Sequence, residues 1–400
     1  MPKSKLSRSG GQKAPIKASR KNGNGRVKNP HLGKIPKSTN LTFGHSYSSP
    51  SHSSSSSHAT FTPKASDVDQ GLLGNCYFLA TLASIANANP KLITDLIKPT
   101  TNDGVLVSLF TDGQWSTIEL SDDVPKRWGL GGRKDAFSRG AHWVKMFEKA
   151  LAHVHGSYAG TQGSSTQGQT STAVAMSQLG FQLKQAYFPL STDQAMAVLE
   201  HLRSAGLAEL FSNDLTFVEG LTNNLTYAEL DRYLAKLGLE QGAHATLMAN
   251  LVNAEIIPGP SGSGTYSKKQ LELYAFLKDH IGVEGENKEA DEGAQDLIAV
   301  AGMTKASANP HELPVQHAYS LLGVVERVEN GPTIKYIKLR NPWGHYDKSK
   351  WKGYEALVTD YENGEFLIPL DAAGGLSFTF GELPPDSSNS SSSSSSSSVN

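Results

Sequence analysis

The hydrophobic pattern changes its period near residue 296, and this change limits the possible folds more than any other feature of the chain. Between 192 and 285 apolar residues recur mostly at helical spacing, with one flexible break at "IIPGPSGSGTYSKK". After 296 the pattern becomes that of strands, in "DLIAVAG", "HAYSLLGVVERV", "TIKYIKLRNPWG" and "GEFLIPL". Helix-rich sequence followed by strand-rich sequence predicts an α+β fold with two lobes.

Helix signals are clear in the first part of the chain. Residues 71–98 contain a glycine turn and then a helix through "CYFLATLASIANA", which stops near Asn89 and Pro90. Residues 142–158 carry an apolar helical stripe, and "STAVAMSQLGF" predicts a further short helix that ends at a glycine.

Two dipeptides predict β-hairpins. Asp112 and Gly113 divide 104–120 into two strands, and Asn330 and Gly331 separate two of the strand-like runs near the C-terminus. The second hairpin places the beginning of one strand beside the end of the next.

The two ends of the chain are polar and rich in serine, so they cannot bury enough apolar surface to order themselves. No internal repeat is evident between them. We therefore predict five segments: a disordered basic and serine-rich segment at 1–60, a helical cysteine-bearing lobe at 61–190, a helical insertion or connection at 191–295, a β-rich lobe at 296–386 and a polyserine tail at 387–400.

Charge is divided unevenly along the chain. The first 66 residues hold twelve of the 37 Lys and Arg residues and none of the 38 Asp and Glu residues, so the remainder carries 25 basic against 38 acidic side chains. Such a basic arm suits an anionic partner, either nucleic acid, a membrane surface or the acidic body itself. An acid-poor, serine-rich basic N-terminus also resembles a transit peptide, so organelle targeting stays open.

The chain has one cysteine, which excludes an internal disulfide. No apolar run approaches the roughly 20 residues that span a bilayer, and the N-terminus lacks the apolar core of a signal peptide. We expect a cytoplasmic protein without a transmembrane segment.

The single cysteine, Cys76, follows a turn with Gly71 and Gly74 and is expected to begin a helix. A helix N-terminus lowers the pKa of a thiol, and a nearby imidazole lowers it further, so the position suits a nucleophile. Gln70 and the backbone N–H of Cys76 together could stabilise an oxyanion. Taken alone, the cysteine also fits a small buried hydrophobic residue and the glutamine a solvated turn residue.

A partner for the thiol is suggested by the second hairpin. His317 opens one strand and Asn341 ends the next, and each lies twelve residues from Glu329 at the bend. In an antiparallel pair these two side chains should be near neighbours at the open end, where the amide could orient the imidazole. The bend is Asn-Gly-Pro, so the register could slip by one or two residues. Two unrelated polar residues at strand ends are the alternative.

Three blocks, "DVDQGLLGNCYFLATLASIA", "HAYSLLGV" and "LRNPWG", stand in an order that resembles the protease core of the calpains, papain-like cysteine endopeptidases. "WSTIELSDDVP" and "WVKMFEKALAHVHGSYAGTQGSST" are also similar to calpain core sequence. The resemblance covers about 61–190 and 296–370 and implies a papain-like two-lobed fold. It assigns Cys76 as nucleophile, His317 as general base and acid, and Asn341 as the group that orients the imidazole.

The resemblance also implies that Gln70 is the oxyanion-hole side chain and that Trp343 lies at the cleft between the lobes. Its implied activity is hydrolysis of peptide bonds in protein substrates through an acyl-enzyme. A catalytically inactive scaffold that kept the core and a papain-fold acyltransferase are the alternative functions.

The sequence departs from the family beside the nucleophile and in the calcium sites. Asn75 and Tyr77 flank the cysteine where the family carries Asp and Trp, and Gln316 stands where its histidine block begins with Gly. The resemblance implies three acidic calcium ligands: Asp67, Asp347 and Glu365. The helix "TAVAMSQLG" lacks the carboxylate that the family supplies, and Asn363 stands where an Asp is common. We therefore expect no required cofactor, with calcium possible at incomplete sites and activity that depends on it weakly or not at all.

Overall fold

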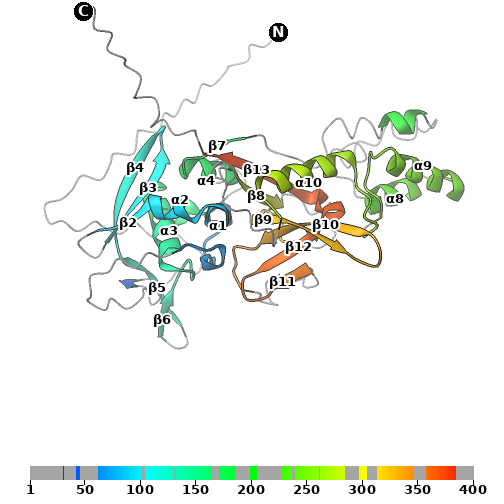
Figure 1. Ribbon diagram of the computed structural model, residues 1–400. Coiled ribbons are helices and arrows are strands. Elements are labelled where there is room, and N and C mark those ends of the chain that lie inside the picture. Colours follow the sequence, from blue (N-terminus) through cyan, green and yellow to red (C-terminus); the bar gives the residue numbers. More distant parts are fainter. Residues whose placement is uncertain are drawn as a thin grey trace, which may run out of the picture.

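The protein is represented by a computed structural model, which combines helices and antiparallel sheets (Figure 1). The structure describes residues 30, 42–45, 62–100, 104–129, 132–163, 171–184, 199–204, 227–236, 239–260, 262–283, 297–303, 313–345 and 357–383. None of the helices in these stretches is long and apolar enough to cross a membrane.

The helices lie mainly in the first three quarters of the chain. The α-helices are α1 (Cys76–Ala88), α2 (Pro90–Leu96), α3 (His142–Val154), α4 (Thr172–Gln178), α8 (Tyr227–Lys236), α9 (Gln241–Asn253) and α10 (Lys268–His280). Short 3₁₀ helices are η1 (Ala65–Asp67), η2 (Ala159–Thr161) and η4 (Leu370–Gly375).

The strands form three antiparallel sheets among the described residues. One small sheet has the order β1-β5-β6, from β1 (Thr42–His45), β5 (Asp123–Gly129) and β6 (Gly132–Asp135). The other has the order β2-β3-β4, from β2 (Ile97–Pro99), β3 (Gly104–Thr111) and β4 (Gln114–Ser121). The large sheet has seven strands in the order β11-β12-β10-β9-β8-β13-β7. These are β7 (Gln182–Leu183), β8 (Leu297–Met303), β9 (His317–Val328), β10 (Thr333–Arg340), β11 (Val358–Asp360), β12 (Glu365–Pro369) and β13 (Leu376–Glu382).

Helix α1 is buried along nearly its whole length, because it packs between the other elements of the cysteine-bearing part of the chain, such as α3, and the large sheet (Figure 1). Two hydroxyl groups fix it on the sheet: Ser84 donates to the carbonyl of Ala299 on β8 at 2.8 Å, and Ser320 on β9 donates to the carbonyl of Ala80 at 2.9 Å. The nucleophile candidate therefore begins a helix that is held directly against β8 and β9.

The opposite face of the large sheet is covered by α10. Strand β8 divides its residues between the two faces with period two, as a two-sided buried strand must. Ile298 and Val300 join the core around α1, whereas Leu297 and Ala299 join the core that includes α10. The sheet is therefore sandwiched between helices that come from distant parts of the chain.

Helices α8 and α9 have a small core of their own, built on Leu230, Leu234, Leu247 and Leu251. Helix α10 differs, because Leu273 and Leu277 belong to the core of the large sheet. The predicted insertion at 191–295 thus holds helices with two different packing roles. The predicted segment boundaries near residues 60, 190, 295 and 386, and the polyserine tail at 387–400, lie outside the described residues.

The predicted helices at 76–89, 142–158 and 172–180 and both hairpins are confirmed by α1, α3, α4 and the strand pairs β3–β4 and β9–β10. Strand β1 lies inside the segment predicted to be disordered, where it pairs with β5 through Thr42 and Lys126 among others. For these four residues the prediction was wrong, because backbone pairing with β5 supplies order that the local composition does not. Strand β13 was missed.

Candidate active site

Cys76 is the first residue of α1, and its thiol is partly exposed. Burial raises the pKa of the Cys76 thiol, while the backbone N–H groups of Ala318, Tyr77 and Cys76 itself act in the opposite direction by hydrogen bonding to the sulfur. The contact with Ala318 places the sulfur beside the residue that follows His317. The start of α1 therefore lies next to the start of β9.

His317 and Asn341 are brought together. The Nε2 atom of His317 lies 2.9 Å from Oδ1 of Asn341, and both residues are buried. Burial lowers the pKa of His317 to about 4, although the hydrogen bond to Asn341 works against this shift. The imidazole is consequently neutral near pH 7.

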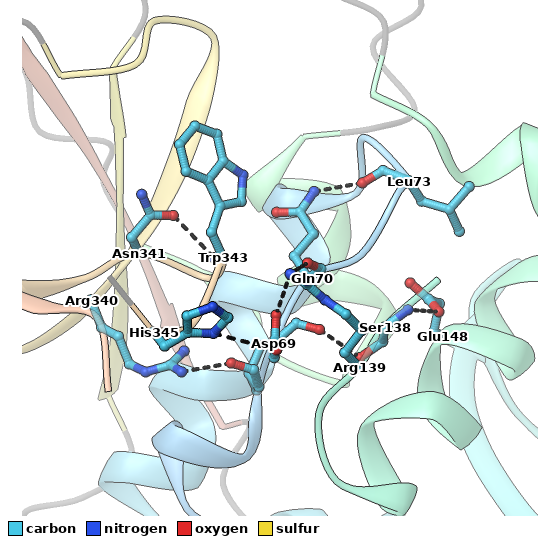
Figure 2. Close-up of polar contacts among 11 residues, drawn as sticks. Asp69, Gln70, Leu73, Ser138, Arg139, Glu148, Arg340, Asn341, Trp343 and His345 are labelled. Carbon is cyan, nitrogen blue, oxygen red and sulfur yellow. Dashed lines mark hydrogen bonds and ion pairs between the residues drawn. The ribbon is translucent and has the colours of Figure 1, made fainter. Parts of the chain in front are cut away.

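The indole of Trp343 lies over the imidazole, with ring centroids 4.6 Å apart. The backbone N–H of Trp343 donates to Oδ1 of Asn341 at 3.1 Å (Figure 2), so this oxygen contacts both His317 and Trp343. The edge of Tyr319 closes another side of the imidazole at a centroid distance of 4.9 Å. Trp343 therefore shields the His317–Asn341 hydrogen bond from water, which strengthens it.

At the open end of the hairpin the register differs by two residues from one centred on Glu329, which is within the slip of one or two residues expected at the Asn-Gly-Pro bend, and the two side chains meet. The turn centres on Asn330 and Gly331, which both have positive φ, and not on Glu329. A bulge between Lys338 and Leu339 shifts the pairing back by one residue, so that Arg340 lies opposite Ser320. Asn341 reaches the imidazole because it lies just beyond the end of β10.

Gln316 immediately precedes His317 and has a φ of 53°, in the left-handed region. This conformation is unfavourable for a residue with a Cβ, and glycine would adopt it without strain. The side chain of Gln316 is exposed. A glycine is thus the residue that this backbone position favours, as in the family pattern.

Gln70 is almost completely buried, and its side-chain amide faces the end of its own loop. Its Nε2 atom donates to the carbonyl of Leu73 at 2.5 Å (Figure 2), and its backbone N–H donates to the carbonyl of Pro342 at 2.7 Å. A side-chain amide has two N–H donors, so one remains for an oxyanion. The loop before Cys76 and the segment after Asn341 are thereby joined directly.

Arg340 makes a second link between these two segments, and the sequence analysis missed it. Its side chain is fully buried, and Nη2 donates to the carbonyl of Val68 at 2.6 Å. Burial lowers the pKa of Arg340 to about 10, while the charges of Glu365 and Asp69 oppose this shift most. A guanidinium directly before Asn341 therefore helps to hold the two segments in place.

Glu148 on α3 was also missed. It is fully buried, and its two oxygens accept from Nδ2 of Asn75 at 2.7 Å and from the backbone N–H of Ser138 at 3.0 Å. Burial raises the pKa of Glu148 to about 7. The signal was present in the sequence, because Glu148 stands four residues after Val144 and three before Leu151, on the buried face of the helix.

The described candidate calcium ligands are engaged in other interactions. Asp67 accepts from Nε1 of Trp143 at 2.8 Å and from the backbone N–H of Lys64 at 2.9 Å, and Glu365 forms an ion pair with Lys338 at 2.7 Å. Asp347 lies outside the described residues. Within the part of the chain that the structure describes, no three His, Cys, Asp or Glu side chains are grouped as a metal site. The carboxylates of Asp67 and Glu365 thus have protein partners in this arrangement.

These elements together suit nucleophilic acyl transfer. A thiol lies at the start of a helix, a neutral imidazole can accept its proton, and a carboxamide orients the imidazole.

Comparisons with known proteins agree with this chemistry. The model of the calpain family of cysteine proteases matches residues 35–216 and 269–356. The chain is 36% identical to human calpain-12 over 98 residues, which are 23% of this chain and 14% of calpain-12. It is 30% identical to the calpain-type cysteine protease DEK1 of Zea mays over 148 residues, which are 36% of this chain and 7% of that protein. The chain therefore matches only a small part of each of these relatives.

Proposed function

Because the chain belongs to the calpain family of cysteine proteases, we propose that it is a cysteine endopeptidase that hydrolyses peptide bonds in proteins. In this proposal Cys76 is the nucleophile, His317 the general base and acid, and Asn341 the orienting group. The observation that carries the proposal is the hydrogen bond between His317 and Asn341, in a site where α1, which begins at Cys76, is held on β9 by the hydrogen bond from Ser320 to Ala80. The imidazole and the thiol supply parts that thiol hydrolysis needs.

The reaction begins with proton transfer from the thiol to Nδ1 of His317. Burial raises the pKa of Cys76 and lowers that of His317 to about 4, so the resting pair is a neutral thiol and a neutral imidazole. Transfer of the proton creates a thiolate and an imidazolium, and each charge stabilises the other. The helix N-terminus and the three N–H groups near the sulfur favour the thiolate further.

The thiolate then attacks the carbonyl carbon of the scissile peptide bond. The oxyanion receives the N–H of Cys76 and the second N–H of Gln70, while Trp343 keeps water from the His317–Asn341 hydrogen bond. His317 returns its proton to the leaving amine as the C–N bond breaks. Water, deprotonated by His317, hydrolyses the thioester and regenerates the thiol.

We propose a papain-like layout for this site, with the cleft between a cysteine-bearing lobe and a β-rich lobe. Two separate hydrophobic cores support it, one around α1 and α3 and the other between α10 and the large sheet. The hydrogen bonds from Arg340 to Val68 and from Gln70 to Pro342 cross between the two parts.

We further propose that the activity does not require calcium. The support comes from Asp67 and Glu365, whose carboxylates are already engaged by Trp143 and Lys338, and from α4, which carries no carboxylate. We also propose a cytoplasmic protein whose basic first 66 residues bind an anionic partner; most of this arm lies outside the described residues.

The test uses the fact that Cys76 is the only cysteine in the chain. The full-length wild type should cleave casein, and both Cys76→Ala and iodoacetamide-treated wild type should be inactive while keeping the far-UV circular dichroism of the wild type. Cleavage that survives in Cys76→Ala would contradict the proposal. A wild type that cleaves nothing would favour an inactive scaffold, and incorporation of a labelled amine into a glutamine substrate would favour acyl transfer.

A further inference from the structure

We propose that Glu148 is a positioning residue that sets the spacing between the two oxyanion donors, the side chain of Gln70 and the backbone N–H of Cys76. This inference rests on the proposed function and deepens it. Glu148 does not touch the reacting atoms. It acts through two chains of hydrogen bonds, one from each oxygen of its carboxylate.

The first chain leads to Cys76. Oε1 of Glu148 accepts from Nδ2 of Asn75 at 2.7 Å, and Asn75 directly precedes the nucleophile. Asn75 is fully buried, and its carbonyl accepts the N–H groups of Phe78 and Leu79, which open α1. Glu148 therefore fixes the residue from which the helix and the N–H of Cys76 take their direction.

The second chain leads to Gln70. Oε2 of Glu148 accepts from the backbone N–H of Ser138 at 3.0 Å (Figure 2). The next residue, Arg139, hydrogen-bonds to both Asp69 and Gln70. The backbone N–H of Arg139 donates to the carbonyl of Asp69 at 2.8 Å. Its Nη2 atom lies 2.9 Å from Oδ1 of Asp69 and 3.1 Å from the carbonyl oxygen of Gln70.

The loop from Gln70 to Asn75 has little freedom against this support. A Cβ on Gly71 would overlap the carbonyl group of Phe137, so the two backbones are in direct contact at this point. Ser138 adds a hydrogen bond from its hydroxyl to the carbonyl of Asp69 at 3.1 Å. The positions of Gln70 and Cys76 therefore both depend on the carboxylate of Glu148.

Burying a carboxylate at this position costs free energy, so packing alone does not explain Glu148. Glu148 is only 2% exposed, and Lys145, whose charge acts to lower the pKa of Glu148, forms an ion pair with Asp135. Burial of a charged group costs free energy that burial of an apolar side chain does not. What the carboxylate offers is two acceptor oxygens for two N–H donors, one on Asn75 at the end of the loop and one on Ser138, in the segment that holds the beginning of the loop.

The test compares Glu148→Met with Glu148→Gln. Met has a similar size and no acceptor for either donor. Gln keeps an oxygen for Ser138, and its NH2 group can donate to Oδ1 of Asn75 after that amide rotates, an oxygen that has no partner in the structure. We expect Glu148→Met to lower kcat on a peptide substrate roughly tenfold to a hundredfold with little change in KM, and Glu148→Gln to recover most of the loss.

Two readouts separate positioning from general damage. A peptide aldehyde forms a tetrahedral adduct that needs the oxyanion donors, whereas alkylation of Cys76 by iodoacetamide does not. Glu148→Met should therefore weaken aldehyde inhibition about as much as it lowers kcat, while the alkylation rate stays within about threefold of wild type. Lys149→Met is the matched control, because Lys149 is the next buried polar residue of α3 and bonds to Ser121 and Asp123, away from the loop.

A wild-type kcat in folded Glu148→Met would overturn the proposal, and so would equal losses in Glu148→Met and Lys149→Met. If Glu148→Met does not fold, Asn75→Ala removes the hydrogen bond between Asn75 and Glu148 instead. This variant should also weaken aldehyde inhibition while leaving the alkylation rate nearly unchanged. Failure of the proposed function is distinguishable, because the wild type itself would then neither cleave the peptide nor bind the aldehyde.

Discussion

Nε2 of His317 and Oδ1 of Asn341 lie 2.9 Å apart, and the oxygen also accepts the backbone N–H of Trp343. Since this oxygen can only accept, Nε2 must carry the hydrogen of the neutral imidazole. Nδ1 is then the basic nitrogen. The tautomer that can receive the proton of Cys76 is thus determined by Asn341 and by the turn that follows it.

The replacement Asn341→Ala should lower kcat by about ten- to a hundredfold, because the imidazole loses the acceptor that fixes its tautomer and the imidazolium loses a hydrogen bond of about 1.5–3 kcal/mol. Steady-state kinetics on a peptide substrate measure this loss. Asn341→Asp, which keeps an acceptor, should retain more activity. Equal activity of Asn341→Ala and wild type would contradict the orienting role.

The replacement Trp343→Ala should raise the pKa of His317 from about 4 toward the ordinary histidine value, because burial is the larger cause of the shift and the indole supplies part of that burial. Nuclear magnetic resonance titration of the imidazole, assigned by its absence in His317→Ala, measures the change. Trp115→Ala is the control, since Trp115 is exposed on β4. An unchanged pKa in Trp343→Ala would show that the indole does not shield the ring.

Glu148 should make the stability of the protein depend on pH. Its pKa is about 7 in the folded state and 4.5 in the reference state, so the folded protein binds the extra proton between these values. Stability from this group is therefore present at low pH and is lost as pH rises through 7. Urea unfolding at pH 5 and pH 8 should show wild type losing about 2 kcal/mol more than Glu148→Gln over this interval. Identical pH dependence in the two proteins would be the contrary result.

Removal of calcium should leave activity unchanged. Casein cleavage in excess chelator is expected to equal that in millimolar calcium, and complete loss in chelator would refute the proposal of calcium independence. Asp67→Asn keeps an acceptor for Trp143 and should behave like wild type in both buffers. Asp67→Ala should instead lower the free energy of unfolding by about 1–2 kcal/mol, because Trp143 and the N–H of Lys64 lose their acceptor.

Local signals predicted the elements that carry the site. The run from Cys76 to Ala88 is apolar and ends before a proline, and both hairpins have residues that accept positive φ at their turns. These features are decided by neighbours in sequence, so they could be read from it. The placement of His317 near Asn341 followed from the hairpin, within the slip of one or two residues expected at its bend.

The remaining contacts depend on tertiary packing. Arg340 and Val68 are 272 residues apart, and no local pattern indicates that a guanidinium donates to that carbonyl. The burial of Glu148 could be inferred from its place on the apolar face of α3, but its partner Asn75 could not, because Asn75 lies 73 residues away. Strand β1 depends in the same way on β5, and its own sequence carries too little apolar content to indicate pairing.

Segments from early and late in the chain meet at the large sheet. Strand β7 forms one edge of it, α1 covers one face and α10 covers the other. A single backbone cleavage between residues 184 and 297 would therefore break the covalent link without separating the pieces. The nicked molecule would run as two bands on a denaturing gel and as one particle on a sizing column. Neither piece would be expected to fold as an independent module.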